Sequence, residues 1–342
     1  MKSSQVNFAD RLRRYRFEKL VGNKQNIGHL LIEAGLNSLN LKLTGSVIKL
    51  WDKKIGTPQC SCMKKRHKPE ILLATSVISH EPIVINNLDF TGFAESIEHL
   101  IKHHNLKAVI GLGINGLKDD ALLFEKLPTS QKNFLLYLKV RKIPIGCRGT
   151  ETKEFLRRIE FKDENLFLTG CPSLQLIKEP IKKIPFVFSR VLTTGALETR
   201  LDLLESRSSI NTKFLFIPQD VDSYSQGLEI SKSDHRIEIF LPATYDAWLQ
   251  KIKEWQPEIA LGTRLHGNMA ALSLGIPTMF MSGDIRTREI TQLAKLPFAD
   301  DLIEICTALD LMTGHHDLNP EGIPTHLASQ IRLCLREFID RA

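Results

Sequence analysis

The chain has 342 residues, of which 42% are hydrophobic and 25% are charged, and its net charge is +7. This length exceeds one ordinary domain core and predicts two domains, while the composition excludes a disordered protein. No apolar run approaches the ~18 residues that cross a bilayer, and the first 20 residues lack the apolar core of a secretion signal. We therefore expect a cytoplasmic protein.

The positive charge gathers at the amino terminus. Residues 1–70 carry 15 Lys or Arg against 5 Asp or Glu, a net charge of +10, so the rest of the chain carries −3. Such a segment attracts anionic partners. Residues 8–20 have roughly helical apolar spacing, which fits either a helix packed on its own domain or a basic helix lying peripherally on a membrane surface. The segment lacks interleaved stacking aromatics, so we expect no nucleic-acid partner.

The six cysteines do not predict a metal site. Only Cys60 and Cys62 form a cluster, with His67 nearby, and no second ligand pair follows at zinc-binding spacing. Reduced thiols fit a cytoplasmic location, and we expect no metal.

Short apolar strands alternate with helical segments in the first half of the chain. The predicted strands cover residues 46–51, 71–77, 82–86, 107–114, 143–149 and 165–171. Residues 93–105, 130–142 and 150–160 have the helical period, the last with a threonine cap.

The pattern restarts after residues 171–185, whose prolines and lysines predict a linker. In the second half, a helix is predicted over 245–255 and strands over 186–191, 213–220, 236–243, 258–266 and 277–284. This alternation is typical of parallel α/β sheets. We predict an α/β fold with two Rossmann-like domains that face a cleft. They cover residues 1–175 and 185–342, and the last helix is a candidate to pack back on the first domain.

The stretch "GTRLHGNMAALSLGIP" follows a predicted strand and places Arg264 and His266 two residues apart. A short helix is expected from Gly267, through Asn268, to a stop at residues 275–277. Its N-terminus favours an anion, and an arginine binds phosphate or carboxylate bidentately. In the alternative interpretation, His266 caps the helix and Arg264 pairs with an acidic neighbour. The pattern alone leaves both open.

Other polar residues follow predicted strands and are candidates to line the same cleft. Arg288 and Glu289 are interpreted as a solvated helix N-terminus, and Gln219 and Asp220 mark a further strand end. The candidate binding residues at such ends or in glycine-containing turns are Arg190, Arg148, Asn268, Gly267, Asp284, Arg286, Asn26, His29 and Asn115.

Several of these motifs occur together, in a fixed order, in one known family. "IPIGCRGTETKEFL", "FLTGCPSL", "LGTRLHGNMAALSLGIPTMF" and "GDIRTREITQLAKLP" resemble motifs of the polysaccharide pyruvyl transferases. The turn at residues 22–28 resembles that family's Asn-x-Gly-Asp turn, so the similarity spans roughly residues 20–300.

The resemblance implies a GT-B-like fold and transfer of a pyruvyl group from phosphoenolpyruvate to a sugar, with release of phosphate. It implies a glycan or lipid-linked glycan acceptor in exopolysaccharide or cell-envelope assembly, and no cofactor beyond the donor substrate. The family's Arg-x-His motif maps onto Arg264, as the phosphate-binding group, and His266, as the general acid/base. Arg190 or Arg148 is expected to bind the carboxylate, and the basic segment is a candidate for contact with the inner face of the membrane.

One position departs from the family. His29 stands where the family often has an aspartate. If that aspartate is the base toward the acceptor, then His29 replaces it, another group acts as the base, or this protein has a different acceptor or activity. Two alternative functions stay open. One is a nucleotide-sugar-dependent glycosyltransferase of GT-B architecture, and the other is a non-catalytic glycan-binding relative, which His29 supports.

Overall fold

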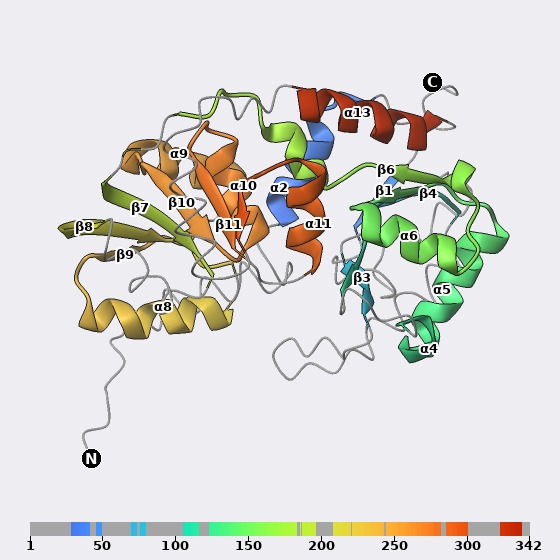
Figure 1. The fold of residues 1–342 in the computed structure, drawn as a ribbon, viewed down its shortest axis with the longest axis horizontal. Coiled ribbons are helices and arrows are strands. Elements are labelled where there is room, and N and C mark those ends of the chain that lie inside the picture. Colours follow the sequence, from blue (N-terminus) through green and yellow to red (C-terminus); the bar gives the residue numbers. More distant parts are fainter. Residues whose placement is uncertain are drawn as a thin grey trace, which may run out of the picture. The chain divides into compact units, whose positions relative to one another are not determined.

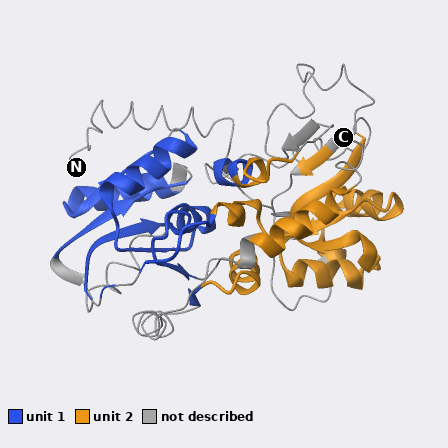
Figure 2. Cartoon of the chain, turned by 90° about the horizontal axis from the view of Figure 1, so that it is seen from above, with its two compact units in different colours: residues 1–34, 177–281, 297–319 blue, residues 35–176, 282–296, 320–342 orange. Residues whose placement is uncertain are grey.

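The computed structural model describes residues 29–41, 46–49, 70–73, 76–79, 105–115, 123–182, 185, 187–195, 208–219, 221–242, 244–281, 285–299 and 322–336. The chain divides into two compact units, each with its own sheet (Figures 1 and 2). Unit 1 comprises Met1–Ala34, Ile177–Met281 and Pro297–Asn319. Unit 2 comprises Gly35–Leu176, Ser282–Leu296 and Pro320–Ala342.

The sheet of unit 2 has six parallel strands in the described part of the chain. Their order is β1-β2-β4-β5-β6, and β3 also pairs with β4. The strands are β1 (Ser46–Lys49), β2 (Glu70–Leu73), β3 (Ser76–Ser79), β4 (Leu106–Asn115), β5 (Ile145–Cys147) and β6 (Leu166–Leu168). Strand β4 is buried from Ala108 to Ile114, which explains its continuous apolar sequence, because a central parallel strand is covered on both faces.

Helices and short turns surround this sheet. They are α4 (Leu123–Lys126), α5 (Thr129–Val140), α6 (Thr150–Arg158), η2 (Asp163–Asn165), η3 (Pro172–Leu176), α11 (Ile285–Leu293) and α13 (Gly322–Cys334). Helix α6 has Glu151 in its first turn and Arg157 and Arg158 in its last, which complements the helix dipole. Helix α13 packs on β6 and η3. Helix α2 (His29–Asn37) runs across the division between Ala34 and Gly35.

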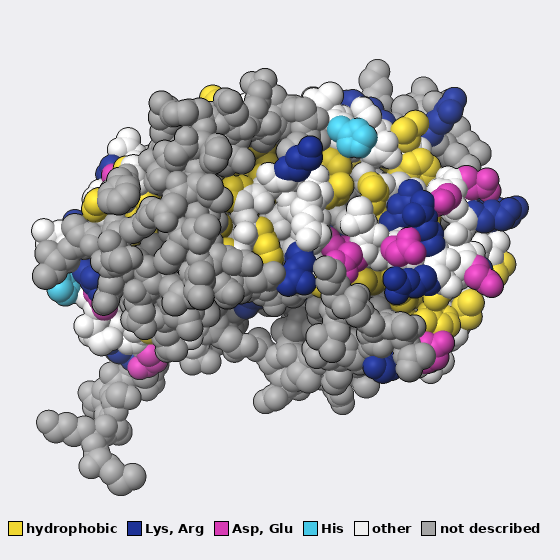
Figure 3. All heavy atoms as spheres, in the orientation of Figure 1, with side chains coloured by type: hydrophobic (Ala, Val, Ile, Leu, Met, Phe, Trp, Pro, Cys, Tyr) yellow, Lys and Arg dark blue, Asp and Glu magenta, His cyan; other side chains and the backbone are white. Residues whose placement is uncertain are grey.

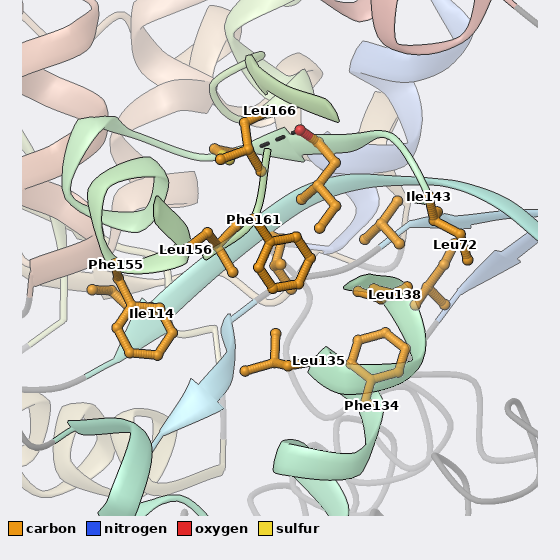
Figure 4. Close-up of a cluster of buried hydrophobic side chains, with 14 of the residues drawn as sticks. Leu72, Ile114, Phe134, Leu135, Leu138, Ile143, Phe155, Leu156, Phe161 and Leu166 are labelled. Carbon is orange, nitrogen blue, oxygen red and sulfur yellow. Dashed lines mark hydrogen bonds between the residues drawn. The ribbon is translucent and has the colours of Figure 1, made fainter. Parts of the chain in front are cut away.

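The core of unit 2 lies between the sheet and helices α5 and α6. Phe134 and Leu138 of α5 lie in one buried cluster with Leu156 of α6 and with Phe161, and Figure 4 shows these side chains grouped together. Ile285, at the start of α11, belongs to the same cluster. The apolar period predicted for residues 130–142 and 150–160 therefore points into this core.

The sheet of unit 1 also has six parallel strands within the described residues. They are β7 (Phe188–Thr194), β8 (Ser208–Phe216), β9 (Ile237–Ile239), β10 (Ile259–Gly262), β11 (Thr278–Met281) and β12 (Phe298–Ala299). Their order in the sheet is β12-β11-β10-β7-β8-β9. In chain order this is 6-5-4-1-2-3, the doubly wound arrangement of Rossmann folds.

Helices α8 (Val221–Ser233), α9 (Tyr245–Trp255) and α10 (Leu265–Leu272) connect strands of this sheet. Helix α9 begins as its sequence predicts, because Thr244 Oγ1 accepts a hydrogen bond of 3.1 Å from the amide of Ala247. It ends at Gln256, whose φ of 53° lies in the left-handed region.

The predicted α/β class with two Rossmann-like sheets is confirmed. The strand predicted over 71–77 is split into β2 and β3, and β12 was not predicted. Residues 171–176, predicted as part of a linker, form a turn in which Cys171–Gln175 are buried. The predicted strand 82–86 lies outside the described residues, as does the predicted helix 93–105 apart from Asn105.

The two compact units do not follow the chain order that we predicted for the domains. Residues 1–34 group with the second sheet, whereas 282–296 and 320–342 group with the first. The contacts of α11 and α13 explain this grouping: α11 packs on β4 and α6, and α13 packs on β4, β5, β6 and η3.

Candidate active site

The candidate site lies where the strand order of unit 1 reverses. Strand β7 is paired on one side with β8 and on the other with β10, so the connections leave toward opposite edges of the sheet. In doubly wound sheets, ligands bind at this switch point, outside the carboxyl ends of the strands. Those ends are Thr194 of β7 and Gly262 of β10, which are register partners.

The junction of β10 and α10 places Arg264 and His266 at this edge. Strand β10 ends at Gly262, and α10 begins at Leu265, two residues before the predicted start at Gly267. Arg264 is the N-cap residue, with extended backbone and no side-chain cap hydrogen bond. His266 is the second residue of the helix and not its cap, so the capping interpretation of His266 was wrong. Both side chains are half-buried, which leaves them accessible from solvent.

Three glycines allow the first turn of α10 to pack closely against the end of β7. A Cβ added to Gly267 would lie 2.4 Å from Thr194 Cγ2, and one added to Gly262 would lie 2.0 Å from Thr194 Oγ1. Gly195 has a φ of +90°, and a Cβ there would lie 2.3 Å from Thr263 Oγ1. Glycines at these positions therefore let the N-terminus of α10 sit directly over the carboxyl end of the sheet.

Asn268 fixes this arrangement through its side chain. It is fully buried, and its Nδ2 donates to the carbonyl oxygens of Gly262 (2.7 Å) and Met279 (3.3 Å). Thr194 Oγ1 donates to Asn268 Oδ1 at 2.9 Å. These bonds tie α10 to β7, β10 and β11. We had expected Asn268 to bind substrate, but its carboxamide is occupied in holding the helix.

Gln219 also reaches the first turn of α10. It follows β8 by three residues and is 1% exposed. A Cβ added to Gly267 would lie 2.5 Å from its Nε2, so the carboxamide lies beside that turn. The sequence identified Gln219 only as a polar residue at a strand end.

We had predicted that Arg190 lies at a strand end, and this prediction was wrong. Strand β7 continues for four residues to Thr194, which separates Arg190 from the carboxyl edge by about 13 Å along the strand. Its amide donates to Glu258 Oε2 at 3.2 Å, and its carbonyl accepts from the amide of Glu258, next to the start of β10. The structure thus places Arg190 at the amino edge of the sheet, away from Arg264.

Arg148 lies at the carboxyl end of β5 in unit 2. It is 3% exposed, and its amide donates to the carbonyl of Leu112 at 2.8 Å. Its side chain packs on Gly113 of β4, where an added Cβ would lie 3.2 Å from Arg148 Cδ. Its positive charge lowers the pKa of Glu289, against the larger effect of burial.

Glu289 of α11 is fully buried, which contradicts its interpretation as part of a solvated helix N-terminus. Burial raises the pKa of its carboxyl to about 7, although hydrogen bonds from Thr152 act in the opposite direction. Arg286 and Arg288, on the same helix, are half-buried. This helix belongs to unit 2.

The exposed face of α6 carries paired charges. Arg157 Nε lies 2.6 Å from Asp163 Oδ1, and Lys153 and Glu154 join the same network. Figure 3 shows dark blue and magenta side chains interspersed over α6. Because these pairs are exposed and neutralise one another, this face is a solvated surface and not an anion site.

Asn26 and Asp284 lie outside the described residues. The backbones of His29 and Asn115 lie in α2 and β4, and their side chains are outside the described part, as are Cys60, Cys62 and His67. Among the described residues, no three His, Cys, Asp or Glu side chains form a group that could hold a metal ion. None of the described helices is long and apolar enough to span a bilayer.

Two of the solved structures to which the chain is similar are named as epimerases of a nucleotide sugar. The UDP-GlcNAc 2-epimerase of Methanocaldococcus jannaschii has 12% sequence identity and a TM-score of 0.45, with 85% of this chain and 99% of that chain covered. The UDP-N-acetylglucosamine 2-epimerase of Rickettsia bellii has 12% identity and a TM-score of 0.46, with 87% and 97% covered. No curated protein sequence matches the chain significantly.

A family model identifies the chain more specifically. The model described as polysaccharide pyruvyl transferase matches residues 66–284. This match covers more than half of the 342 residues and includes the junction of β10 and α10 with Arg264 and His266. The chain therefore belongs to the polysaccharide pyruvyl transferase family.

Proposed function

We propose that this protein transfers the pyruvyl group of phosphoenolpyruvate to a sugar of a polysaccharide or of a lipid-linked glycan precursor. The products are a pyruvate ketal and inorganic phosphate. The observation that carries this proposal is the position of Arg264 and His266 at the N-terminus of α10, beside the switch point of the unit 1 sheet. The family match of residues 66–284 supports it independently.

The donor is an anion, and the first turn of α10 suits an anion. The first N–H groups of a helix have no acceptor within the helix, and its dipole favours negative charge at this end. Arg264 adds a guanidinium that can bind phosphate through two hydrogen bonds. We assign the phosphate to this position, where the same groups stabilise the negative charge that grows as phosphate leaves.

The proposed reaction needs one group near the donor that gives and takes protons. A proton adds to the methylene carbon of phosphoenolpyruvate, and C2 gains oxocarbenium character. The first sugar hydroxyl forms a bond to C2 and loses its proton, and the C2–O bond to phosphate breaks with its electron pair on phosphate. The second hydroxyl then closes the ketal and loses its proton. One hydroxyl proton balances the proton gained by the methyl group, and the other leaves with phosphate.

His266 is our candidate for this proton transfer, because imidazole exchanges protons near neutral pH. It lies two residues from Arg264, in the first turn of the same helix, so it is close to the expected position of the donor. The basic segment of residues 1–70 would bring the protein to an anionic lipid-linked acceptor at the inner face of the membrane.

The proposal is tested by measuring phosphate release from phosphoenolpyruvate in the presence and absence of glycan acceptors. We expect release only with a suitable acceptor. His266→Ala should lower kcat about 100-fold or more, and Arg264→Ala should raise KM for phosphoenolpyruvate. His235→Ala and Arg158→Ala, which change exposed residues of the same types, are the matched controls and should retain full activity.

A thermal-shift comparison separates the proposal from the nucleotide-sugar alternative. Phosphoenolpyruvate should stabilise the protein, because a ligand that binds only the folded state raises its apparent stability. If nucleotide sugars raised the Tm of the protein and phosphoenolpyruvate did not, the pyruvyl transferase proposal would be rejected. Turnover that survives in folded His266→Ala would remove this histidine from its proposed role.

A further inference from the structure

Gln219 is a buried carboxamide with an unused donor. It is 1% exposed, and within the described structure its Nε2 has no hydrogen-bond partner. A buried N–H that lacks an acceptor destabilises a folded protein, and most such groups are paired. The described residues therefore supply no acceptor for this donor, and its position in the fold decides whether a ligand could supply one.

The unused donor lies beside the first turn of α10. A Cβ added to Gly267 would lie 2.5 Å from Gln219 Nε2. Gly267 is the third residue of the helix, and its N–H is one of those that a helix leaves without an internal acceptor. The glycine therefore keeps open the space that the carboxamide occupies, and the two donors share one end of the helix.

A second buried carboxamide at the same junction behaves differently. Asn268 donates through Nδ2 to Gly262 and Met279 and accepts from Thr194. This side chain is used to hold the fold, and its donors are paired accordingly. Gln219 makes no comparable bond through Nε2 in the described residues, so the same structural role does not account for it.

We propose that Gln219 Nε2 donates a hydrogen bond to the phosphate group that binds at the first turn of α10. It would be a substrate-binding residue that complements Arg264 with a neutral donor. The identity of the ligand as phosphoenolpyruvate rests on the proposed function above, whereas binding of a phosphate group at this turn does not.

The test compares Gln219→Met with wild type by isothermal titration calorimetry, using phosphoenolpyruvate and inorganic phosphate as separate probes. Methionine keeps the length of the side chain and removes the donor. Loss of one hydrogen bond to a charged group should raise Kd about ten- to a hundred-fold, while Tm stays the same or rises because an unpaired buried donor is gone.

The matched control is Gln175→Met, since Gln175 is also buried, at 5% exposure, and its Nε2 also has no partner among the described residues. It lies on η3 in unit 2 and should bind both probes as wild type does.

Gln219→Glu provides a second, isosteric variant. Its carboxylate offers only acceptors and should repel phosphate at pH 8. At pH 5.5 a buried carboxyl takes up a proton and can donate again. The affinity of this variant relative to wild type at the same pH should therefore recover, and a purely structural role for Gln219 would not produce such recovery.

The outcomes separate this inference from the proposed function. If Gln219→Met folds and binds both probes with wild-type Kd, Gln219 is not a ligand-binding residue, and the pyruvyl transferase proposal is unaffected. If wild type binds phosphate but not phosphoenolpyruvate, the proposed donor is wrong, and the phosphate titrations alone decide the role of Gln219. Wild-type protein that binds neither probe would overturn both.

Discussion

Thr152 donates two hydrogen bonds to the carboxylate of Glu289, although 137 positions separate the two residues. The amide of Thr152 lies 2.5 Å from Oε1, and its hydroxyl lies 2.9 Å from Oε2. The same hydroxyl accepts from the amide of Ile114 at 3.2 Å. Glu289 thus satisfies donors in the first turn of α6 that would otherwise be unpaired, and it ties α11 to α6 and β4 within unit 2.

Glu289 should make stability depend on pH between about 4.5 and 7. Burial raises the pKa of this carboxyl from its ordinary value of 4.5 to about 7. The folded state therefore holds the proton more tightly than the unfolded chain. This contribution to stability is complete below the unfolded pKa and is lost as the pH rises through the folded pKa. The shift corresponds to about 3 kcal/mol of unfolding free energy.

Glu289→Gln is the variant that tests this, because the amide does not titrate. The difference in unfolding free energy between wild type and this variant, from urea denaturation at pH 4.5, 5.5, 6.5 and 7.5, should shift by about 3 kcal/mol in favour of the variant. Glu160→Gln is the control, since Glu160 is exposed and bonded to Lys139. If the difference in unfolding free energy between wild type and Glu289→Gln stayed constant from pH 4.5 to 7.5, the pKa of Glu289 would not be raised by folding.

Asn268→Asp should destabilise the protein rather than weaken substrate binding selectively. The change replaces Nδ2, which donates to the carbonyls of Gly262 and Met279, with an acceptor in a fully buried position. Breaking a buried network in this way costs about 2–4 kcal/mol. Thermal unfolding should show a fall in Tm, whereas Asn133→Asp on the exposed side of α5 should show none. A variant with wild-type Tm and raised KM would restore Asn268 to the binding residues.

The class of fold could be predicted from the sequence because the strands are short, apolar and separated by helical periods. The start of α10 was predicted to within two residues, because Gly267 and Gly275 mark the limits of a short helix. Strand β10, predicted over 258–266, ends four residues earlier, at Gly262. Polar residues misled the prediction at β7. Its last two residues, Thr193 and Thr194, are buried in the sheet, but threonines do not extend an apolar pattern, so the strand seemed to end near Arg190.

Long-range partners account for the rest of the differences. Glu289 was predicted to be a surface residue because the sequence near it is charged. Its hydrogen-bond partner Thr152 lies in a helix far away in the chain. Gln219 likewise has its neighbour Gly267 48 residues downstream. No local period encodes such contacts. Their only local signal is a polar residue next to a strand end or a helix start.

Gly267→Ala should lower both stability and the affinity for phosphoenolpyruvate, even though alanine favours helices by about 1 kcal/mol over glycine. Its Cβ would lie 2.4 Å from Thr194 Cγ2 and 2.5 Å from Gln219 Nε2, so the first turn of α10 would have to move. Adding Thr194→Ser removes Cγ2 but keeps the hydroxyl that bonds Asn268. This double variant should recover part of the lost Tm in a thermal melt. Wild-type Tm and Kd in the single variant would mean that α10 does not sit tightly on β7.

Arg190→Ala should leave the affinity for phosphoenolpyruvate within about twofold of wild type, in contrast to Arg264→Ala. Arg190 lies four residues before the end of β7, beside Glu258 at the amino edge of the sheet, and parallel sheets bind ligands at the other edge. Arg264 is the N-cap of α10, where loss of a charged hydrogen bond should weaken Kd at least about tenfold. Calorimetric titration of both variants measures the two effects side by side. A large loss of affinity in Arg190→Ala with unchanged Tm would show that the donor extends to the amino edge of the sheet, and would move the proposed site away from the first turn of α10.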